Sequence, residues 1–139
     1  NGEWNKWGLL WMCGKGMSDS TIGIVGLGRI GLAIARRLQS MAIKKILYSG
    51  TRKKQFDSDE DKQLFSFVPF DQLLEESDFV IISCSLNSQT KNMFDSCAFK
   101  KMKKDAILIN VSRGEIVDQD ALYDALTTGK IAAAGNSNI

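Results

Sequence analysis

The chain has 139 residues, of which 44% are hydrophobic and 24% charged, with a formal net charge of +2. This length suits one domain with a substantial core, and the composition is typical of a soluble globular protein rather than a disordered or membrane chain. The small net charge gives no reason by itself to expect a nucleic-acid or membrane partner. We expect a cytoplasmic protein, because no signal-peptide pattern opens the chain and its apolar runs are too short to span a membrane.

Three details of the composition bear on chemistry. The three cysteines, Cys13, Cys84 and Cys97, are an odd number without metal-ligand spacing, which favours reduced structural thiols and no metal site. The chain contains no histidine, so the commonest general acid and base is missing. It begins at Asn1 rather than Met, which suggests an interior piece or a processed product.

The most informative segment is an apolar run that breaks into Gly26-x-Gly28-x-x-Gly31. In the phosphate-binding turn of a dinucleotide fold, the first glycine permits a tight turn and the second admits a pyrophosphate. The third lets the following helix pack on the sheet, while free amides near Arg29 and Ile30 would face the anion. A tight turn that binds nothing is the alternative interpretation.

The flanks of this turn favour nucleotide binding. The apolar residues before it, Ile22, Ile24 and Val25, predict a strand. The residues after it predict a helix whose apolar side is formed by Ile30, Ile34, Leu38 and Met41. A strand before the glycines and a helix after them are the context that the motif requires.

The rest of the chain alternates expected strands and helices. Strands are expected at 45–49, 64–68, 78–83, 106–111 and from 131 to 134, and helices at 71–76, 94–102 and 119–128. The charged segment 51–62 should be a loop or a weak helix. This alternation predicts an α/β fold with a doubly wound, mostly parallel sheet of Rossmann type, whose ligand lies at the carboxyl ends of the strands.

The residues at the ends of two expected helices indicate how each helix is capped and which residues face solvent. Asp118 should cap the helix at 119–128 and Gly129 should end it, with Ala121, Leu122, Ala125 and Leu126 facing inward. Lys100, Lys101, Lys103 and Lys104 close the helix at 94–102. They favour a solvated face over a nucleic-acid site, because helix dipoles attract cations there and no aromatic residues are interleaved.

Three parts of the chain are expected: a helical arm at 1–18, a nucleotide-binding domain at 19–135 and an atypical end at 136–139. On a helix, Trp4, Trp7 and Trp11 would form one aromatic stripe. This stripe could pack against its own domain, or against another subunit or a neighbouring domain.

The loop after the expected strand at 45–49 bears on the choice of nucleotide. NAD-binding folds place an acidic residue about 20 positions beyond the glycines to bind the ribose hydroxyls. Here the sequence reads Ser49-Gly50-Thr51-Arg52-Lys53-Lys54, and the first acid is Asp57. This basic loop favours NADP, whose extra phosphate Arg52 and Lys53 would bind with help from Ser49 or Thr51. A solvated surface loop is the alternative.

Three motifs in order resemble the D-2-hydroxyacid dehydrogenases: Gly26-Leu-Gly-Arg-Ile-Gly31, Ser83-Cys84-Ser85-Leu86 followed by Thr90, and Asn110-Val111-Ser112-Arg113-Gly114. The resemblance covers residues 1 to 135, and the chain is most similar to the branch that reduces glyoxylate and hydroxypyruvate. It implies a coenzyme domain that is inserted into a split substrate domain and forms much of a homodimer contact.

The resemblance also implies roles for single residues. Gly28, Arg29 and Ile30 would surround the pyrophosphate, and Ser49 and Arg52 the adenosine phosphate. Ser85 and Leu86 would contact the middle of the cofactor, and Val111 and Ser112 the nicotinamide. Arg113 would bind a small 2-oxo acid substrate. An arginine just past a buried strand can bind a carboxylate or polarise a ketone, although it can also be an ordinary surface residue.

The chain departs from the family after its last expected strand. It reads Ala133-Ala134-Gly135-Asn136-Ser137-Asn138-Ile139, and Ser137 stands where the family has an aspartate. The glutamate and histidine of the family mechanism are both absent. We therefore expect a truncated product that keeps only the arginine of the catalytic set and is inactive alone. A non-catalytic NAD(P)-binding interaction or sensor module is the competing interpretation.

Overall fold

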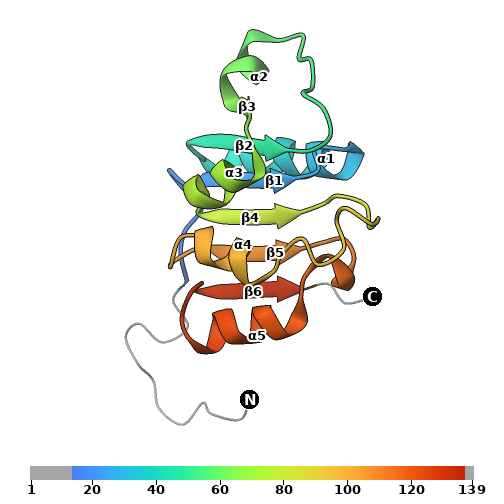
Figure 1. Cartoon of the computed structure of the whole chain (residues 1–139). Coiled ribbons are helices and arrows are strands. Elements are labelled where there is room, and N and C mark those ends of the chain that lie inside the picture. The colour runs from blue at the N-terminus through green and yellow to red at the C-terminus, as the bar shows by residue number, and fades with distance from the viewer. Residues whose placement is uncertain (1–13, 137–139) are drawn as a thin grey trace.

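The computed structural model describes residues 14–136, which form a six-stranded parallel sheet with helices on both faces (Figure 1). The strands are β1 (Thr21–Val25), β2 (Lys45–Ser49), β3 (Phe65–Phe67), β4 (Phe79–Ile82), β5 (Ile107–Asn110) and β6 (Ala133–Asn136). The helices are α1 (Arg29–Leu38), α2 (Asp59–Leu64), α3 (Phe70–Glu76), α4 (Ser96–Lys101) and α5 (Gln119–Thr127). The strand order β3-β2-β1-β4-β5-β6 confirms the doubly wound parallel sheet expected from the sequence.

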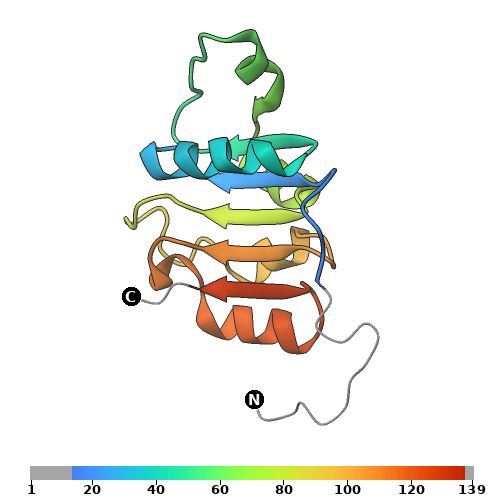
Figure 2. The ribbon, with the colours of Figure 1, turned by 180° about the vertical axis from the view of Figure 1, so that it is seen from behind.

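The two faces of the sheet are covered unequally. Helices α3, α4 and α5 lie over one face (Figure 1), where Val80 and Leu108 join their buried apolar residues. Helix α1 lies over β1 and β2 on the other face, and no described helix covers β5 and β6 on that side (Figure 2). Ile107 and Ile109 on that side of β5 are accordingly only partly buried, whereas Ile24 and Ile81 nearer to α1 are buried.

Helix α1 contacts the sheet through smaller residues than expected. Gly31, Ala35 and Leu38 are its buried positions, while Ile30 is 63% exposed and Met41 is 49% exposed. The expectation that Ile30 and Met41 belong to the buried side was therefore wrong. Because Gly31 and Ala35 let the helix approach the strands closely, the buried stripe runs through them rather than through the larger side chains.

Two further expectations need correction. Helix α4 starts at Ser96 rather than at Phe94, because Phe94 forms a parallel bridge with Val117 and the Asp95 side chain caps the helix. In α5, Leu126 is 39% exposed rather than inward, because the helix packs through Leu122 and Ala125. The cap by Asp118 and the end at Gly129, whose φ is +65°, are confirmed.

The described end of the expected arm, residues 14–18, contains no helix and passes the amino ends of the strands. The tryptophan stripe and residues 137–139 lie outside the described residues. Within 14–136 no helix is long and apolar enough to cross a membrane, and Cys84 and Cys97 have free thiols.

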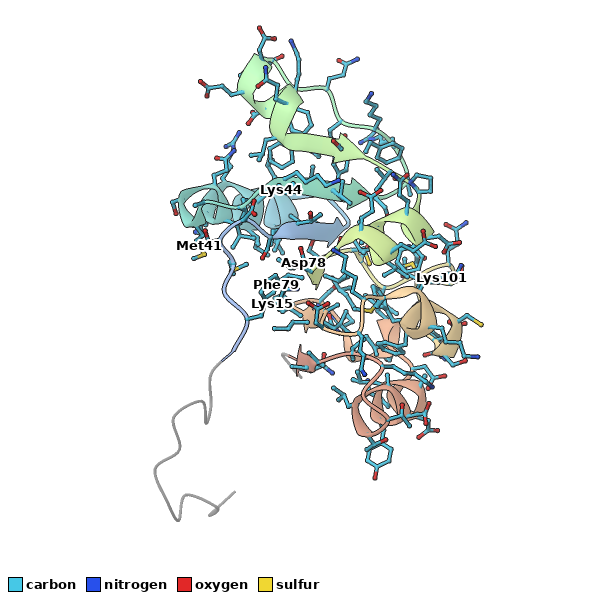
Figure 3. The ribbon with its side chains drawn as sticks, turned by 90° about the vertical axis from the view of Figure 1, so that its left-hand side faces the viewer. Lys15, Met41, Lys44, Asp78, Phe79 and Lys101 are labelled. Carbon is cyan, nitrogen blue, oxygen red and sulfur yellow. The ribbon has the colours of Figure 1, made fainter. Side chains whose placement is uncertain are left out.

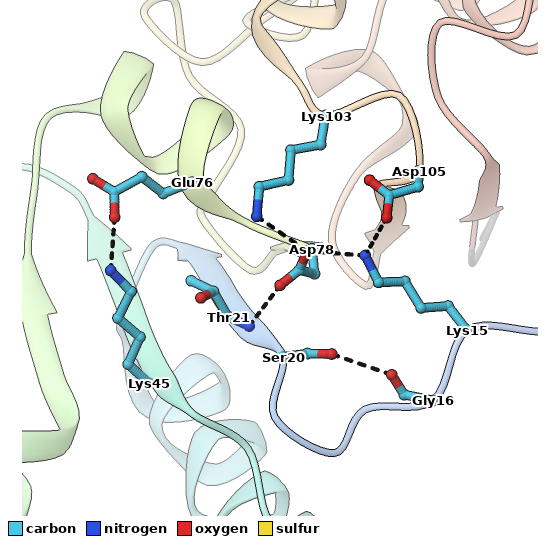
Figure 4. A network of polar contacts seen from close by, with 9 residues as sticks. All are labelled: Lys15, Gly16, Ser20, Thr21, Lys45, Glu76, Asp78, Lys103 and Asp105. Atoms are coloured by element: carbon cyan, nitrogen blue, oxygen red, sulfur yellow. Dashed lines mark hydrogen bonds and ion pairs between the residues drawn. The ribbon is translucent and has the colours of Figure 1, made fainter.

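A polar network joins the described end of the arm to the amino edge of the sheet (Figures 3 and 4). The carboxylate of Asp78 accepts hydrogen bonds from Lys15 Nζ at 2.9 Å, Lys103 Nζ at 3.1 Å and the Thr21 amide at 2.8 Å. Lys15 also binds Asp105 at 2.7 Å. Partial burial acts to raise the pKa of Asp78, but these hydrogen bonds outweigh it and lower the pKa from 3.8 to about 2.

The same contacts account for part of the lysine cluster at the end of α4. Lys101 pairs with Asp71 of α3, and Lys103 pairs with Asp78. Two of the four lysines are therefore held by carboxylates of this chain.

Candidate nucleotide-binding site

The register of the parallel strands brings four loops to one edge of the sheet. Val25 pairs with both Ser49 and Ile82, and Ile82 pairs with Asn110. The amide of Gly26 donates to the carbonyl of Ser49 at 2.9 Å, so the pairing continues into the first residue of the turn. Between β1 and β4 the strand order reverses, and this switch point is where open α/β sheets bind ligands.

Two glycines of the turn are required by their surroundings. Gly26 has a φ of +91°, and a Cβ there would lie 2.6 Å from the Cα of Cys84. A Cβ on Gly31 would lie 2.5 Å from the Gly26 carbonyl oxygen and 2.7 Å from Ser83 Oγ. Ser83 Oγ donates to that carbonyl at 2.7 Å and so fixes the turn. The roles expected for these two glycines match this geometry.

Gly28 differs, because a Cβ there would meet no atom within 4 Å. The described fold does not need a glycine at this position, so the open space is available to a ligand. Gly28 is also the N-cap of α1 and has no side chain to bind the first amides. The first turn of α1 holds no acidic residue, so the amides of Arg29 and Ile30 lie at a helix terminus of the kind that favours anions.

A cleft of about 770 Å³ opens at this edge. Among the residues expected to bind cofactor, those that line it are Gly26, Gly28, Ser49, Arg52 and Ser85. Thr51 and Lys54 line the same cleft, and Arg52 is exposed. No ion pair within residues 14–136 uses an arginine, so the guanidinium of Arg52 is available to a phosphate.

The apolar part of the cleft lining was not predicted from the sequence. It is formed by the segment from the end of β3 to the start of α3 and by a residue that precedes α4: Phe67, Val68, Pro69, Phe70 and Met93. Apolar and aromatic side chains of this kind suit the flat face of a nucleotide base. The signal that could have found them is topological, since β3 lies beside β2 and its carboxyl end must reach the same edge.

A buried tyrosine also holds the basic loop. Tyr48 is 2% exposed, and its hydroxyl oxygen accepts a hydrogen bond from the Lys54 amide at 3.0 Å. This contact closes the segment from Ser49 to Lys54, which carries Arg52. Sequence spacing gave no sign of it, because Tyr48 reads simply as an apolar strand residue.

The remaining expected residues lie outside the cleft lining. Lys53 lines a separate cleft of about 650 Å³ beside Phe56 and Lys62, so the structure brings Arg52 but not Lys53 to the main cleft. Leu86 and Val111 are 37% and 38% exposed on the loops after β4 and β5. Arg113, also exposed, immediately precedes the short 3-10 turn η2 (Gly114–Ile116).

The thiol of Cys84 also lines the cleft. Burial raises the pKa of the Cys84 thiol, so this side chain is uncharged at neutral pH and does not repel an anion. Within residues 14–136 there is no group of three or more His, Cys, Asp or Glu side chains that could hold a metal ion.

The strand order, the glycine turn and the uncapped start of α1 at the switch point define a dinucleotide-binding domain of Rossmann type. Residues 1–136 match the family described as D-isomer specific 2-hydroxyacid dehydrogenase, NAD binding domain. The chain belongs to this family, as the sequence motifs indicated.

Individual relatives agree with the family. Glyoxylate reductase/hydroxypyruvate reductase from Mus musculus is 51% identical over 135 residues, which are 97% of this chain and 40% of the relative. The NAD-complexed D-isomer specific 2-hydroxyacid dehydrogenase from Lactobacillus delbrueckii ssp. bulgaricus superposes with a TM-score of 0.80 at 34% identity, covering 90% of this chain and 37% of that one. An acyclic imino acid reductase in complex with NADPH and D-Arg superposes with a TM-score of 0.80 at 27% identity, covering 90% and 38%.

Proposed function

We propose that this chain is the coenzyme domain of an NADPH-dependent reductase that acts on glyoxylate and hydroxypyruvate. The observation that carries the proposal is one cleft that is lined both by Gly28, the N-cap of α1, and by the exposed side chain of Arg52. The amide groups at the start of α1 suit the pyrophosphate, and Arg52 suits a second phosphate on the adenosine ribose. The substrate class rests on the name of the mouse relative, of which the chain spans 40%.

The preference for NADPH rests on the basic loop rather than on the fold. Similar structures hold NAD in one case and NADPH in another, so the architecture is compatible with both cofactors. In this chain Ser49, Thr51 and Arg52 line the cleft, whereas the first acidic residue after the loop, Asp57, lines the separate cleft. Among residues 14–136, no acidic side chain lines the main cleft to bind the ribose hydroxyls of NAD.

Calorimetric titration of the chain with NADPH and NADH tests this proposal. Tighter binding of NADPH is expected, because only NADPH offers a phosphate to Arg52. Equal affinities, or a preference for NADH, would contradict the choice of cofactor.

The proposal assigns Arg113 to the substrate. Its guanidinium would bind the carboxylate of a 2-oxo acid and polarise the keto oxygen, while bound NADPH supplies the hydride. These 139 residues contain no histidine, and loss of a positioned general acid costs about 10²- to 10⁴-fold in rate. A polypeptide of these residues alone should therefore show no useful decay of NADPH absorbance with glyoxylate. A homodimer is part of the same proposal.

The absence of histidine also favours a second candidate, a module that binds the nucleotide without catalysis. The two can be separated by measuring NADPH affinity with and without glyoxylate. A reductase domain should bind NADPH more tightly with glyoxylate present and lose that gain in Arg113→Ala. A module that only senses nucleotide should bind NADPH equally in both conditions.

A further inference from the structure

The last residue of β5, Asn110, has a carboxamide that faces the protein rather than the solvent. Asn110 is 2% exposed. Its Oδ1 accepts a hydrogen bond from the Ser112 amide at 2.9 Å, and its Nδ2 donates to the Arg113 carbonyl at 2.9 Å. Only one orientation of the carboxamide satisfies both partners. In the flipped orientation the Nδ2 donor would face the Ser112 amide, and the Oδ1 acceptor would face the Arg113 carbonyl.

These contacts require an asparagine at this position. The loop offers the Ser112 amide as a donor and the Arg113 carbonyl as an acceptor. The side-chain amide of asparagine has one acceptor and one donor group to match them. Ionised aspartate has no donor, and the hydroxyl of serine or threonine is attached one atom nearer to the backbone, so it lies farther from both partners. Asparagine is disfavoured in strands, so its place in a buried strand indicates that the loop, and not the sheet, depends on it.

The loop after β5 is in turn tied to the loop after β4. Ser112 Oγ donates to the carbonyl of Cys84, which lines the cleft. Thr90 Oγ1 donates to the carbonyl of Ser85 at 2.8 Å and closes the β4 loop on itself. A continuous set of hydrogen bonds therefore runs from Asn110 to the cofactor cleft.

We propose that Asn110 is a positioning residue that holds the loop 111–113 in its binding geometry. The carboxamide is too deeply buried to contact cofactor or substrate. It acts by fixing the backbone on which Val111 and Ser112 meet the nicotinamide half of the cofactor and Arg113 meets the substrate. This inference rests on the proposed function for the identity of those two ligands.

Two ligands distinguish positioning from general stability: NADPH and 2′-phospho-ADP-ribose, which lacks the nicotinamide. In Asn110→Ala, calorimetry should show NADPH binding about tenfold weaker, the scale of one lost hydrogen bond to a well-ordered loop. Binding of the nicotinamide-free ligand should change by less than about twofold, because the start of α1 and Arg52 are untouched.

Two further variants complete the design. Asn110→Thr keeps a strand-forming residue of similar size and should show the same selective loss, because its hydroxyl cannot reach both partners. Asn136→Ala is the matched control, since Asn136 pairs with Asn110 in register on β6 but is exposed. It should leave both affinities unchanged.

Amide hydrogen exchange supplies a readout that needs no ligand. The Ser112 amide should exchange about tenfold faster in both Asn110 variants, while the Ser83 amide, which donates to Val25, should not change. Equal weakening of both ligands, or unchanged exchange at Ser112, would overturn the inference. If the unmodified chain binds neither ligand, the proposed function fails, and exchange at Ser112 still decides whether Asn110 holds the loop.

Discussion

Arg52 is the side chain on which the choice between the two cofactors depends. It lines the main cleft without an ion-pair partner in the described part of the chain. Replacing Arg52 by Ala should reduce the difference in binding free energy between NADPH and NADH by about 1.5 to 3 kcal/mol, the scale of a charged hydrogen bond. Calorimetry with both cofactors measures this difference.

Lys53→Ala is the matched control, because Lys53 is the next cation in the same loop but lines the other cleft. Its effect on the difference should be clearly smaller. An unchanged difference in Arg52→Ala would show that the 2′-phosphate is bound elsewhere.

At this scale, local spacing predicted the residues that belong to one continuous turn. Gly26, Gly28 and Arg52 reach the cleft because they follow strand ends directly, and strand ends are readable from apolar runs. Phe67 and Tyr48 could not be predicted in their roles. Phe67 reaches the cleft through the pairing of β3 with β2, and Tyr48 acts through a hydrogen bond to the folded loop.

The turn from β1 into α1 is the element whose glycines should separate stability from binding. A Cβ on Gly31 would collide with the Gly26 carbonyl, so Gly31→Ala should lower the free energy of unfolding by about 1 to 3 kcal/mol. A Cβ on Gly28 meets only open space, so Gly28→Ala should cost less than about 1 kcal/mol as a poorer N-cap.

NADPH affinity should fall in Gly28→Ala, because the added methyl group would occupy the space of the pyrophosphate. It should also fall in Gly31→Ala, because a Cβ there would displace the Gly26 carbonyl of the same turn. Urea unfolding and calorimetry on the same samples test the pair. Unchanged NADPH affinity in a folded Gly28→Ala variant would contradict the assignment of this turn to the pyrophosphate.

The sequence predicted which segments are helices and which are strands better than it predicted where the helices begin and which of their sides are buried. Continuous apolar runs indicated the central strands, since a strand covered on both faces needs no alternation. The buried side of α1 was misjudged because hydrophobicity favoured Ile30, whereas close packing selected Gly31 and Ala35. The start of α4 was misjudged because a bridge between Phe94 and Val117 is a tertiary contact.

On the scale of the whole molecule, the two edges of the sheet have different tasks. The carboxyl edge carries the cleft, and the amino edge carries the ion-paired network around Asp78 (Figure 4). The pKa of Asp78 in the folded chain, about 2, lies below its ordinary value of 3.8. Ionised Asp78 therefore stabilises the fold above about pH 4, and this contribution is lost as the pH falls through about 2.

Asp78→Asn should lower the free energy of unfolding at pH 7 by about 1 to 2 kcal/mol and flatten its dependence on pH below 4. NADPH affinity at pH 7 should not change, because the network lies at the opposite edge from the cleft. Asp71→Asn is the control. It removes the ion pair with Lys101, and its effect should be smaller because Asp71 is more exposed than Asp78. Urea unfolding at pH 7 and pH 3 measures both, and an unchanged pH dependence in Asp78→Asn would contradict the assignment.

Binding of NADPH at the carboxyl edge is the central claim, and amide chemical shifts of the ¹⁵N-labelled chain during titration with NADPH test it most directly. The largest changes should fall on residues 26–31, 49–54 and 83–86, with none at Lys15, Asp78 or Asp105 on the amino edge. Changes confined to the amino edge or to the cleft around Phe56 and Lys62, or no changes at millimolar NADPH, would contradict it.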